Sequence, residues 1–266
     1  MSSSTGEWLE LGDGVFARRY AELDLTTGLV LGADRALVID TRGDAGQGAE
    51  LLASVRGVTG LPLAVVLTHA HFDHCFGTAA FLPAPVYAHA RCGAAITATA
   101  GAQRDRWVRH YRDDGDGPTA AALAATPDPP LPSVAPDLLD LGGRAVALLH
   151  PGRGHTDHDL VVHVPDAGVV FAGDLLEQGA PPDFEDAYPR EWADAVATVT
   201  ALDASAYVPG HGNPMTPAEA AAQHAELRVV AELAAAVGEG RTTPEEAAAR
   251  SPYPDIPWPR PPRAGT

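Results

Sequence analysis

A run of metal-binding side chains directly follows a strongly apolar segment. Residues 63–67 are continuously hydrophobic, and the next seven residues read Thr-His-Ala-His-Phe-Asp-His. Four of these side chains can bind a metal: His69, His71, Asp73 and His74. Neutral imidazoles offer nitrogen lone pairs and a carboxylate offers oxygen, and both ligand types suit zinc. Because a buried strand would hold these groups rigidly, the pattern predicts metal chemistry rather than a polar turn with coincidental histidines.

Three other predicted strands end in a comparable way. The segments 145–149, 168–172 and 206–208 are apolar, and each is followed by a candidate ligand next to glycine. The three candidate ligands are His155, Asp174 and His211. Glycine lets the backbone turn tightly beside an ion. Each motif alone is a weak signal, but together with the first they predict one shared metal centre.

In this order the motifs resemble those of the metallo-β-lactamase superfamily, and within it the glyoxalase II-like hydrolases. The resemblance covers about residues 8–238 and includes the signature HxHxDH at 69–74. Asp40, which ends the apolar segment 36–40, matches a buried carboxylate that supports the ligands. The resemblance implies a four-layer αββα sandwich of the α/β (α+β) class, with the site along one edge of the sheets.

The resemblance also implies a set of seven metal ligands. One metal would be held by His69, His71 and His155. The other would be held by Asp73, His74 and His211. Asp174 would bridge the two. The expected cofactors are two divalent metal ions, zinc first, with iron or manganese as alternatives because His and Asp serve all three.

The chemistry implied is hydrolysis of an ester-type bond of a small molecule by a metal-bound hydroxide. Asp73 and Asp174 are the expected catalytic residues, with Asp73 helping to orient the nucleophile. A thioester or a lactone is the favoured substrate. Asp174 argues against a β-lactamase, because that branch of the family has Cys or Ser at the matching place. Few residues follow His211 and none is Lys, which argues against a glutathione pocket.

Three other interpretations stay open at this point. A mononuclear-iron oxidoreductase, similar to persulfide dioxygenases, could use a subset of the same ligands. A β-lactamase-like amide hydrolase and a non-catalytic binding protein on the same fold are the others. The sequence has no Gly-x-Ser-x-Gly elbow that would support a serine hydrolase.

Two segments are expected to form the substrate wall. The first is a helical insertion near 91–125 that is rich in Arg, for which we prefer pairing with its own acidic residues Asp105, Asp113, Asp114 and Asp116 over substrate binding. The second is the loop 175–190, where Phe184 and Tyr188 are candidate substrate contacts. Tyr188 could donate a hydrogen bond to the substrate.

Several residues near the motifs have other predicted roles. His158 is a minor candidate for the substrate side, and Asp159 could orient a ligand through a hydrogen bond. Cys75 is expected to be a small buried residue rather than a ligand. His89, His163 and His224 are expected to be ordinary packed or surface residues.

The remaining pattern predicts strands and helices in two similar halves. Strands are expected within 14–40 and at 63–67, 85–89, 145–149, 160–164, 168–172 and 206–208. Helices are expected at 44–56, 74–82, 91–125, 190–202 and 217–237, with a short one starting at the capping box of Thr243. We predict one domain over 1–266, with a Pro-rich C-terminal extension from about 239 that carries Tyr253 and Trp258.

Composition excludes several partners. The 266 residues include 18 basic and 35 acidic side chains, for a net charge of −17, and every basic residue is Arg. Nucleic acid and anionic membranes demand positive charge, so neither is expected as a partner. Two cysteines cannot form a disulfide framework, and the chain shows no secretion signal. We therefore expect a cytoplasmic protein with a small-molecule substrate; the sequence does not indicate an oligomeric state.

Overall fold

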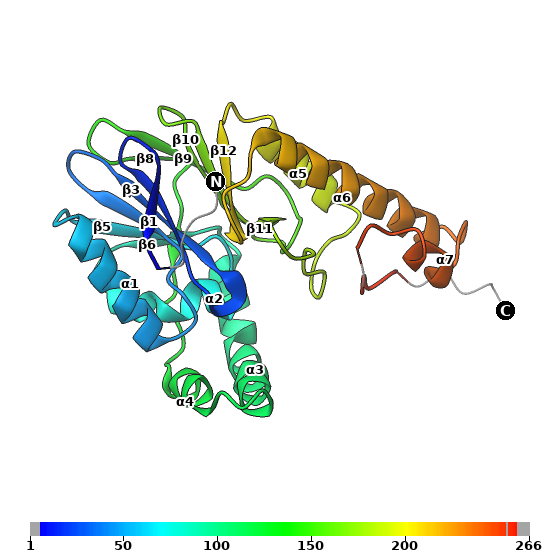
Figure 1. The fold of residues 1–266 in the computed structure, drawn as a ribbon, viewed down its shortest axis with the longest axis horizontal. Coiled ribbons are helices and arrows are strands. Elements are labelled where there is room, and N and C mark those ends of the chain that lie inside the picture. Colours follow the sequence, from blue (N-terminus) through cyan, green and yellow to red (C-terminus); the bar gives the residue numbers. More distant parts are fainter. Residues whose placement is uncertain (1–5, 254, 260–266) are drawn as a thin grey trace.

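Two β-sheets packed face to face form the centre of the molecule in the computed structural model, which describes residues 6–253 and 255–259 (Figure 1). The first sheet has seven strands in the order of the chain. They are β1 (Trp8–Gly12), β2 (Val15–Arg19), β3 (Thr26–Leu31), β4 (Ala36–Ile39), β5 (Leu63–Val66), β6 (Val86–Ala88) and β7 (Ser133–Val134). Strands β1 to β4 are antiparallel, and β4 to β7 are parallel.

The second sheet has five strands, in the order β12-β11-β10-β9-β8. They are β8 (Leu138–Asp140), β9 (Ala145–Leu149), β10 (Val161–Val164), β11 (Val169–Glu177) and β12 (Ala206–His211). Only the β11–β12 pair is parallel among the pairs of this sheet in the described chain.

Alternate residues of the middle strands point to two different hydrophobic cores. On β4, Leu37 and Ile39 join the core between the sheets, whereas Val38 faces the helices. Strand β5 repeats the pattern, with Val65 on the helix side. Successive side chains on a strand point to opposite faces, so a strand covered on both faces must be apolar throughout. The continuous hydrophobicity of 36–39 and 63–66 therefore follows from their position between two layers.

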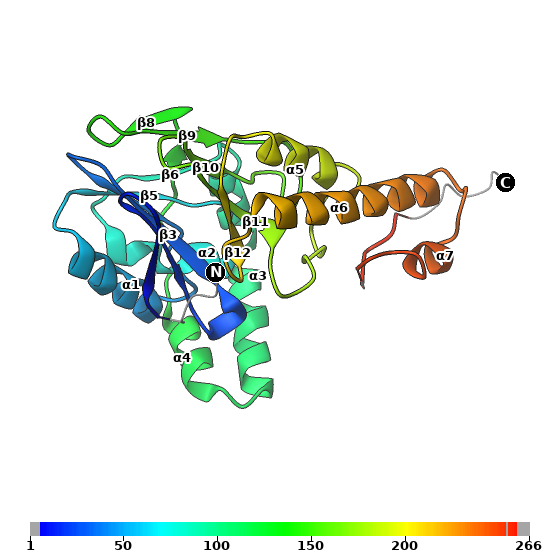
Figure 2. The same cartoon turned by 45° about the horizontal axis from the view of Figure 1, so that its top comes forward.

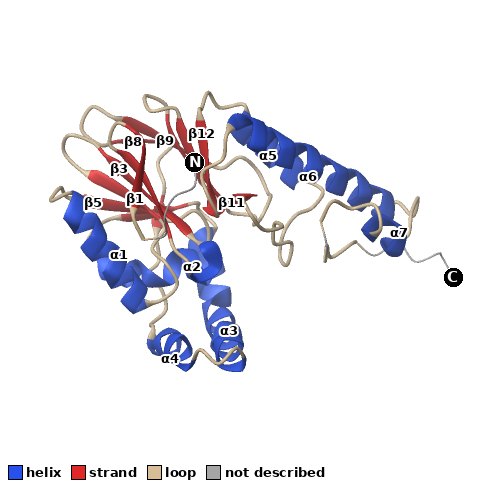
Figure 3. Ribbon diagram, viewed as in Figure 1, coloured by secondary structure: helices blue, strands red, loops and turns tan. Residues whose placement is uncertain are grey.

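Helices cover the outer face of each sheet, so the described residues form four layers (Figure 3). The helices on the side of the first sheet are α1 (Ala45–Val58), α2 (Phe72–Cys75), α3 (Cys92–Asp113) and α4 (Gly117–Ala125), with 3₁₀ turns at Glu22–Asp24 and Phe76–Phe81. Those on the side of the second are α5 (Trp192–Thr200), α6 (Pro217–Gly238) and α7 (Pro244–Ala248). The αββα sandwich predicted from the sequence is confirmed.

Two helical parts extend away from the sheets. Helices α3 and α4 form one projection, and α6 carries α7 outward on the other (Figures 1 and 2). Thr216 begins α6 with the capping box expected for a Ser/Thr followed three residues later by Glu. In the extension, the Tyr253 hydroxyl donates a hydrogen bond to Glu226 at 2.6 Å, and Trp258 packs against the helices. Residues 254 and 260–266 of this extension lie outside the described residues.

The structure corrects several predicted element boundaries. The segment expected as one helix at 74–82 is one α-helical turn followed by a 3₁₀ helix. Strands β11 and β12 run on to Glu177 and His211, because their parallel pairing continues past the points where the apolar pattern breaks. Strands β1, β7 and β8 were not expected. Among the described residues, no helix is long and apolar enough to cross a membrane.

His89 and His150 join the two sheets through a ring stack. Their ring centroids lie 4.2 Å apart at an interplanar angle of 29°, and His150 Nδ1 donates to the carbonyl of Asp159 at 2.8 Å. Burial, together with the nearby His150 and Arg91, lowers the pKa of His89 from 6.5 to about 4. His89 is therefore neutral in the folded protein at neutral pH.

This stack predicts an acid-sensitive contribution to stability. Between pH 6.5 and 4 the unfolded chain binds a proton at His89 that the folded chain does not, so stability falls as the pH is lowered through that window. The wild type should lose unfolding free energy when the pH is lowered from 7 to 5. In His89→Gln we expect this loss to be smaller by about 1 kcal/mol, because Gln does not bind the proton. Urea unfolding of both proteins with chelator present would measure it, and identical pH slopes would contradict it.

Candidate metal centre

The ends of four strands bring the predicted ligands together. The segment after β5 carries His69 and His71, the loop between β9 and β10 carries His155, and Asp174 and His211 lie on β11 and β12. Three groups of ligand atoms each lie within 4.8 Å of one another. The first is His69, His71, His155 and Asp174, and the second is Asp73, His74 and His211. These two contain the sets that the sequence resemblance implied, and the third adds Glu177 to Asp174 and His211.

Asp174 lies between the two groups. Its Oδ2 atom is 3.5 Å from His69 Nε2 and 3.4 Å from His155 Nε2 in the first group. The same oxygen is 3.4 Å from His211 Nε2, and Oδ1 is 3.1 Å from His74 Nε2 in the second. One carboxylate therefore faces both sets of nitrogens, which is the arrangement that a bridging ligand requires.

Asp40 fixes the orientation of His74 from behind. This carboxylate is 2% exposed and accepts hydrogen bonds from the Thr68 backbone N–H and hydroxyl, each at 2.8 Å. Its Oδ2 also lies 2.8 Å from His74 Nδ1, which therefore carries the proton. The lone pair of His74 is left on Nε2, the atom that faces Asp174. This matches the supporting role that the sequence resemblance implied for Asp40.

Backbone carbonyls fix two further histidines in the same way. His211 Nδ1 donates to the Leu23 carbonyl at 2.7 Å, and His155 Nδ1 donates to the Asp183 carbonyl at 3.3 Å. A carbonyl can only accept, so Nδ1 of each ring carries a proton and Nε2 is the atom left to bind a metal. These Nε2 atoms face other ring nitrogens: His211 Nε2 is 3.3 Å from His74 Nε2, and His155 Nε2 is 2.9 Å from His71 Nδ1.

The protonation equilibria of the ligands divide into two types. Burial lowers the pKa of His69 well below its usual value and that of His155 to about 4, so both rings are neutral at pH 7. Burial also disfavours the charged form of His74, but the carboxylates of Asp174, Asp73 and Asp40 hold its pKa well above the usual value. The part of the site that contains the carboxylates thus favours added positive charge.

These observations fit divalent metal ions. The buried Nε2 of His69 has no hydrogen-bond partner among the described residues, and the Nε2 atoms of His74 and His211 face each other at 3.3 Å beside the carboxylates. A divalent cation would satisfy the unpaired nitrogen, take the place of protons on the facing nitrogens and compensate the carboxylates. Three His with one Asp, and two His with two carboxylates counting Asp174, are donor sets that zinc accepts.

Gly210 provides the space that Asp174 occupies. A Cβ atom at position 210 would lie 1.8 Å from Asp174 Oδ1, far inside contact distance. Gly173, next to Asp174, has φ +55°, a backbone conformation that side chains rarely adopt. The glycines beside the predicted ligands are therefore required by the close approach of β11 and β12 and by the turn before Asp174.

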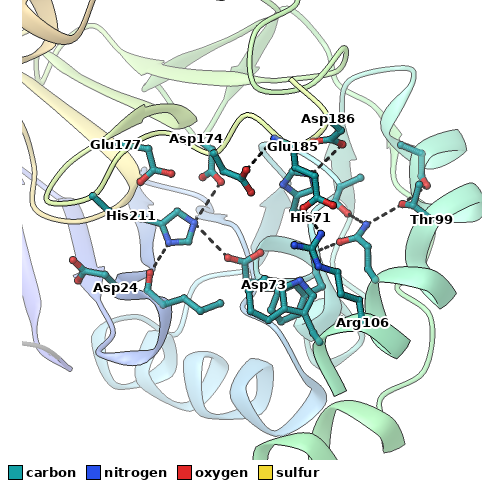
Figure 4. A pocket seen from close by; sticks show the side chains of 18 of the residues that line it. Asp24, His71, Asp73, Thr99, Arg106, Asp174, Glu177, Glu185, Asp186 and His211 are labelled. Carbon is teal, nitrogen blue, oxygen red and sulfur yellow. Dashed lines mark hydrogen bonds and ion pairs between the residues drawn. The ribbon is translucent and has the colours of Figure 1, made fainter. Parts of the chain in front are cut away.

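A pocket of about 440 Å³ opens beside this site (Figure 4). Its walls include the predicted ligands His71, Asp73, Asp174 and His211. The rest comes mainly from Leu23–Asp24, from α3 and from the loop 178–186. The pocket thus gives a small molecule direct access to the candidate metal ligands.

The two predicted substrate contacts on that loop do not line the pocket. Phe184 is 3% exposed and packs against Trp192, with ring centroids 4.9 Å apart, and against Tyr253. Tyr188 lies against Arg153, whose guanidinium is 4.7 Å from the ring centre. The pocket is lined instead by their polar neighbours Asp183, Glu185 and Asp186. The loop was correctly expected at the pocket, but its aromatic side chains point elsewhere.

The arginines of the insertion pair differently from the expectation. Arg106 contacts Glu185 on the loop across the pocket, and Arg104 contacts Asp128 beyond the end of α4. The prediction that these arginines pair with acidic residues of the insertion itself is therefore wrong for both. The expected partners were Asp105, Asp113, Asp114 and Asp116. An ion pair needs side chains that face each other, and along α3 these arginines face other parts of the fold.

The predictions for His158, Asp159 and Cys75 have clear outcomes. His158 lines the pocket, and its Nε2 accepts a hydrogen bond from the Ala70 N–H at 3.2 Å. Asp159 does not orient a ligand ring. Its carboxylate accepts hydrogen bonds from the Thr156 N–H and hydroxyl, at 2.9 and 2.6 Å, and so shapes the turn that carries His155.

Cys75 is buried, as expected, and its thiol lies 3.6 Å from the Ala70 carbonyl.

Sequence reasoning missed two carboxylates at the site. Asp186 Oδ2 lies 3.3 Å from His71 Nε2, and so favours a proton on that nitrogen and leaves Nδ1 to face the centre. Glu177 lines the pocket, and its carboxylate lies within 4.8 Å of ligand atoms of Asp174 and His211, so it could also hold a metal. The only sequence signal for Glu177 is an acidic residue directly after an apolar strand.

The comparisons with known proteins agree with this architecture. The family model described as "Metallo-beta-lactamase superfamily" matches residues 24–211. A metallo-beta-lactamase type 2 from Bacillus cereus is 27% identical over 77% of this chain and 73% of its own length. The acyl-coenzyme A thioesterase MBLAC2 from Gallus gallus is 29% identical over 65% of this chain and 68% of its own.

A solved structure supports the same fold. A metallo-beta-lactamase from Pontibacter korlensis superposes with a TM-score of 0.65 at 19% identity, covering 84% of this chain and 98% of that one. Members of the matched family are typically metal-dependent hydrolases. The family match spans the strands and loops that carry all seven candidate ligands. The chain belongs to the metallo-β-lactamase superfamily.

Proposed function

We propose that this protein is a binuclear, zinc-dependent hydrolase of an ester-type bond in a small molecule, as in the glyoxalase II-like hydrolases that its motifs resemble. The observation that carries the proposal is the position of Asp174, whose two oxygens lie 3.1–3.5 Å from nitrogens of both ligand groups. Bound divalent ions would polarise a carbonyl and lower the pKa of water enough to give a nucleophile at neutral pH.

The side chains of this protein have distinct parts in such a reaction. Asp40 and the Leu23 carbonyl hold His74 and His211 with their lone pairs toward the site. Asp73 lines the pocket, where its carboxylate can accept a hydrogen bond from the attacking water and orient it. The pocket wall positions the acyl group.

A thioester is the first candidate substrate. The relative from Gallus gallus is named as an acyl-coenzyme A thioesterase, which supports thioester cleavage by a similar chain. An amide of the β-lactam type is the second candidate, because other relatives and the solved structure are named metallo-beta-lactamases. The carboxylate at Asp174 favours the thioester.

A substrate panel tests the proposal. Zinc-loaded protein would be assayed with a neutral thioester, a lactone, a phosphodiester and a β-lactam, with Asp13→Ala as a control that removes an exposed carboxylate. We expect hydrolysis of the thioester or the lactone in both proteins, lost with a chelator and restored by zinc. Hydrolysis of the β-lactam alone, or of no substrate, would overturn the proposal.

A further inference from the structure

The backbone on both sides of His71 is held by a side chain of the helical insertion. The Ala70 carbonyl accepts a hydrogen bond from Gln103 Nε2 at 3.0 Å, and the Phe72 N–H donates to Gln103 Oε1 at 2.9 Å. Gln103 lies on α3, far along the chain from the segment that it contacts. One amide group therefore links the insertion to the residues that precede and follow a candidate metal ligand.

The orientation of the Gln103 amide follows from its partners. A carbonyl can only accept and a backbone N–H can only donate, so Nε2 faces Ala70 and Oε1 faces Phe72. Nε2 also donates to the Thr99 hydroxyl oxygen at 2.9 Å, one turn earlier on α3. Both N–H groups of the amide are thus used within the protein. Gln103 lines the pocket, but its amide has no donor left for a substrate.

The start of α2 explains why this support comes from another element. The N-cap residue of α2 is His71, whose side chain makes no capping hydrogen bond within the described chain. An N-cap side chain ordinarily accepts from a backbone N–H of the first turn, but the ring of His71 is turned toward His155, with Nδ1 2.9 Å from Nε2. The first N–H groups of a helix have no partner inside it. Gln103 supplies the acceptor for one of them, at Phe72.

His71 is the histidine of its group that most needs such support. Its side chain is 23% exposed, whereas those of His69 and His155 are each 1% exposed. Surrounding side chains lock a fully buried ring, but a ring at the pocket surface has fewer of them. The ring of His71 also contacts Asp186, whose side chain is 59% exposed. The hydrogen bonds from the half-buried Gln103 are therefore the better protected support of His71.

We infer that Gln103 is a positioning residue for the metal centre, because it fixes the backbone around His71 and so directs Nδ1 toward the site formed with His69 and His155. The inference rests on the proposed function and gives the helical insertion a part in it. In the second ligand group, His74 and His211 are held by Asp40 and by the Leu23 carbonyl. Loss of Gln103 should therefore affect mainly one of the two ions.

Zinc titration of the metal-free, full-length protein tests the inference. Gln103→Met keeps the length of the side chain and removes its hydrogen bonds, whereas Gln103→Glu keeps an acceptor for the Phe72 N–H and removes both donors. Arg109→Met is the matched control, because Arg109 is exposed on the same helix. His71→Ala identifies the site that depends on His71. Urea unfolding of each metal-free protein would show that it folds.

We expect Gln103→Met to weaken zinc binding at one site by about tenfold to a hundredfold, as is usual when a group that orients a ligand is removed. The affected site should be the one that His71→Ala weakens or abolishes, and the other site should be unchanged. Gln103→Glu should lie between the wild type and Gln103→Met, and Arg109→Met should match the wild type. At saturating zinc, the KM of Gln103→Met for the thioester should equal that of the wild type.

Two results would overturn the inference while leaving the proposed function intact. One is zinc affinity at both sites unchanged in Gln103→Met, and a raised KM in that case would make Gln103 a substrate contact. The other is equal weakening of both sites with a lower free energy of unfolding, which would make Gln103 a residue that only stabilises the fold. If Gln103→Met does not fold, the same outcomes in Gln103→Glu decide. Binding of fewer than two zinc ions by the wild type would instead count against the proposed function itself.

Discussion

Replacing Asp174 by Ala is expected to lower the occupancy of both metal sites and to reduce hydrolysis by about a thousandfold or more. The reason is geometric, since this one carboxylate contacts His69 and His155 on one side and His74 and His211 on the other. Its removal takes an anionic ligand from each ion. Metal analysis after gel filtration, together with thioester hydrolysis, would measure both effects.

Two matched variants make this prediction specific. Asp174→Asn keeps the shape and one acceptor oxygen but removes the charge, so we expect it to retain more metal than Asp174→Ala. Asp13→Ala removes an exposed carboxylate in the β1–β2 turn and should behave as the wild type. Normal content of two metals and normal turnover in Asp174→Ala would show that the bridging role is misassigned.

Replacing Asp40 by Ala is expected to destabilise the metal-free protein by about 3–5 kcal/mol. The substitution leaves two buried donors of Thr68 and the Nδ1–H of His74 without their acceptor. It also places Ala at φ +62°, in the left-handed region that Asp and Asn tolerate better. Urea unfolding with chelator present would measure the loss separately from any loss of metal.

Asp40→Asn separates the two causes. It suits the positive φ and keeps one acceptor oxygen, so we expect a smaller loss of about 1–2 kcal/mol. Both variants should also weaken metal binding, because the ring of His74 is no longer held by a carboxylate. An unfolding midpoint of Asp40→Ala equal to that of the wild type would contradict the supporting role of Asp40.

The positions of the candidate ligands followed from sequence because they depend on short-range features. The His-rich segment comes directly after a buried strand, and strand ends with adjacent glycine place single ligands at the same edge of the sheets. Successive side chains of β4 and β5 pack into two different hydrophobic cores. The continuous apolar sequence of these strands predicts this, because it indicates that both faces of the sheet are covered. These features depend on local geometry and on the period of the strand.

The residues that line the pocket could not be predicted from the sequence in the same way. Phe184 is an aromatic residue on the loop expected to contact the substrate. In the folded protein its ring instead packs in the core against Trp192 and Tyr253, which are distant in the sequence. Glu177 reaches the site only because β11 continues its pairing with β12, which the sequence of β11 does not reveal. The partner of Arg106 is likewise set by the position of α3 relative to the loop. Tertiary packing decides each of these.

The number and identity of metals in the native protein test the central claim most directly. Protein isolated without added metal would be analysed by inductively coupled plasma mass spectrometry, and the chelated protein titrated with zinc while hydrolysis is followed. We predict two divalent ions per chain, zinc foremost, with full activity only when both are bound. One iron per chain together with oxygen consumption, or no metal at all with stability unaffected in His71→Ala, would contradict the binuclear hydrolase.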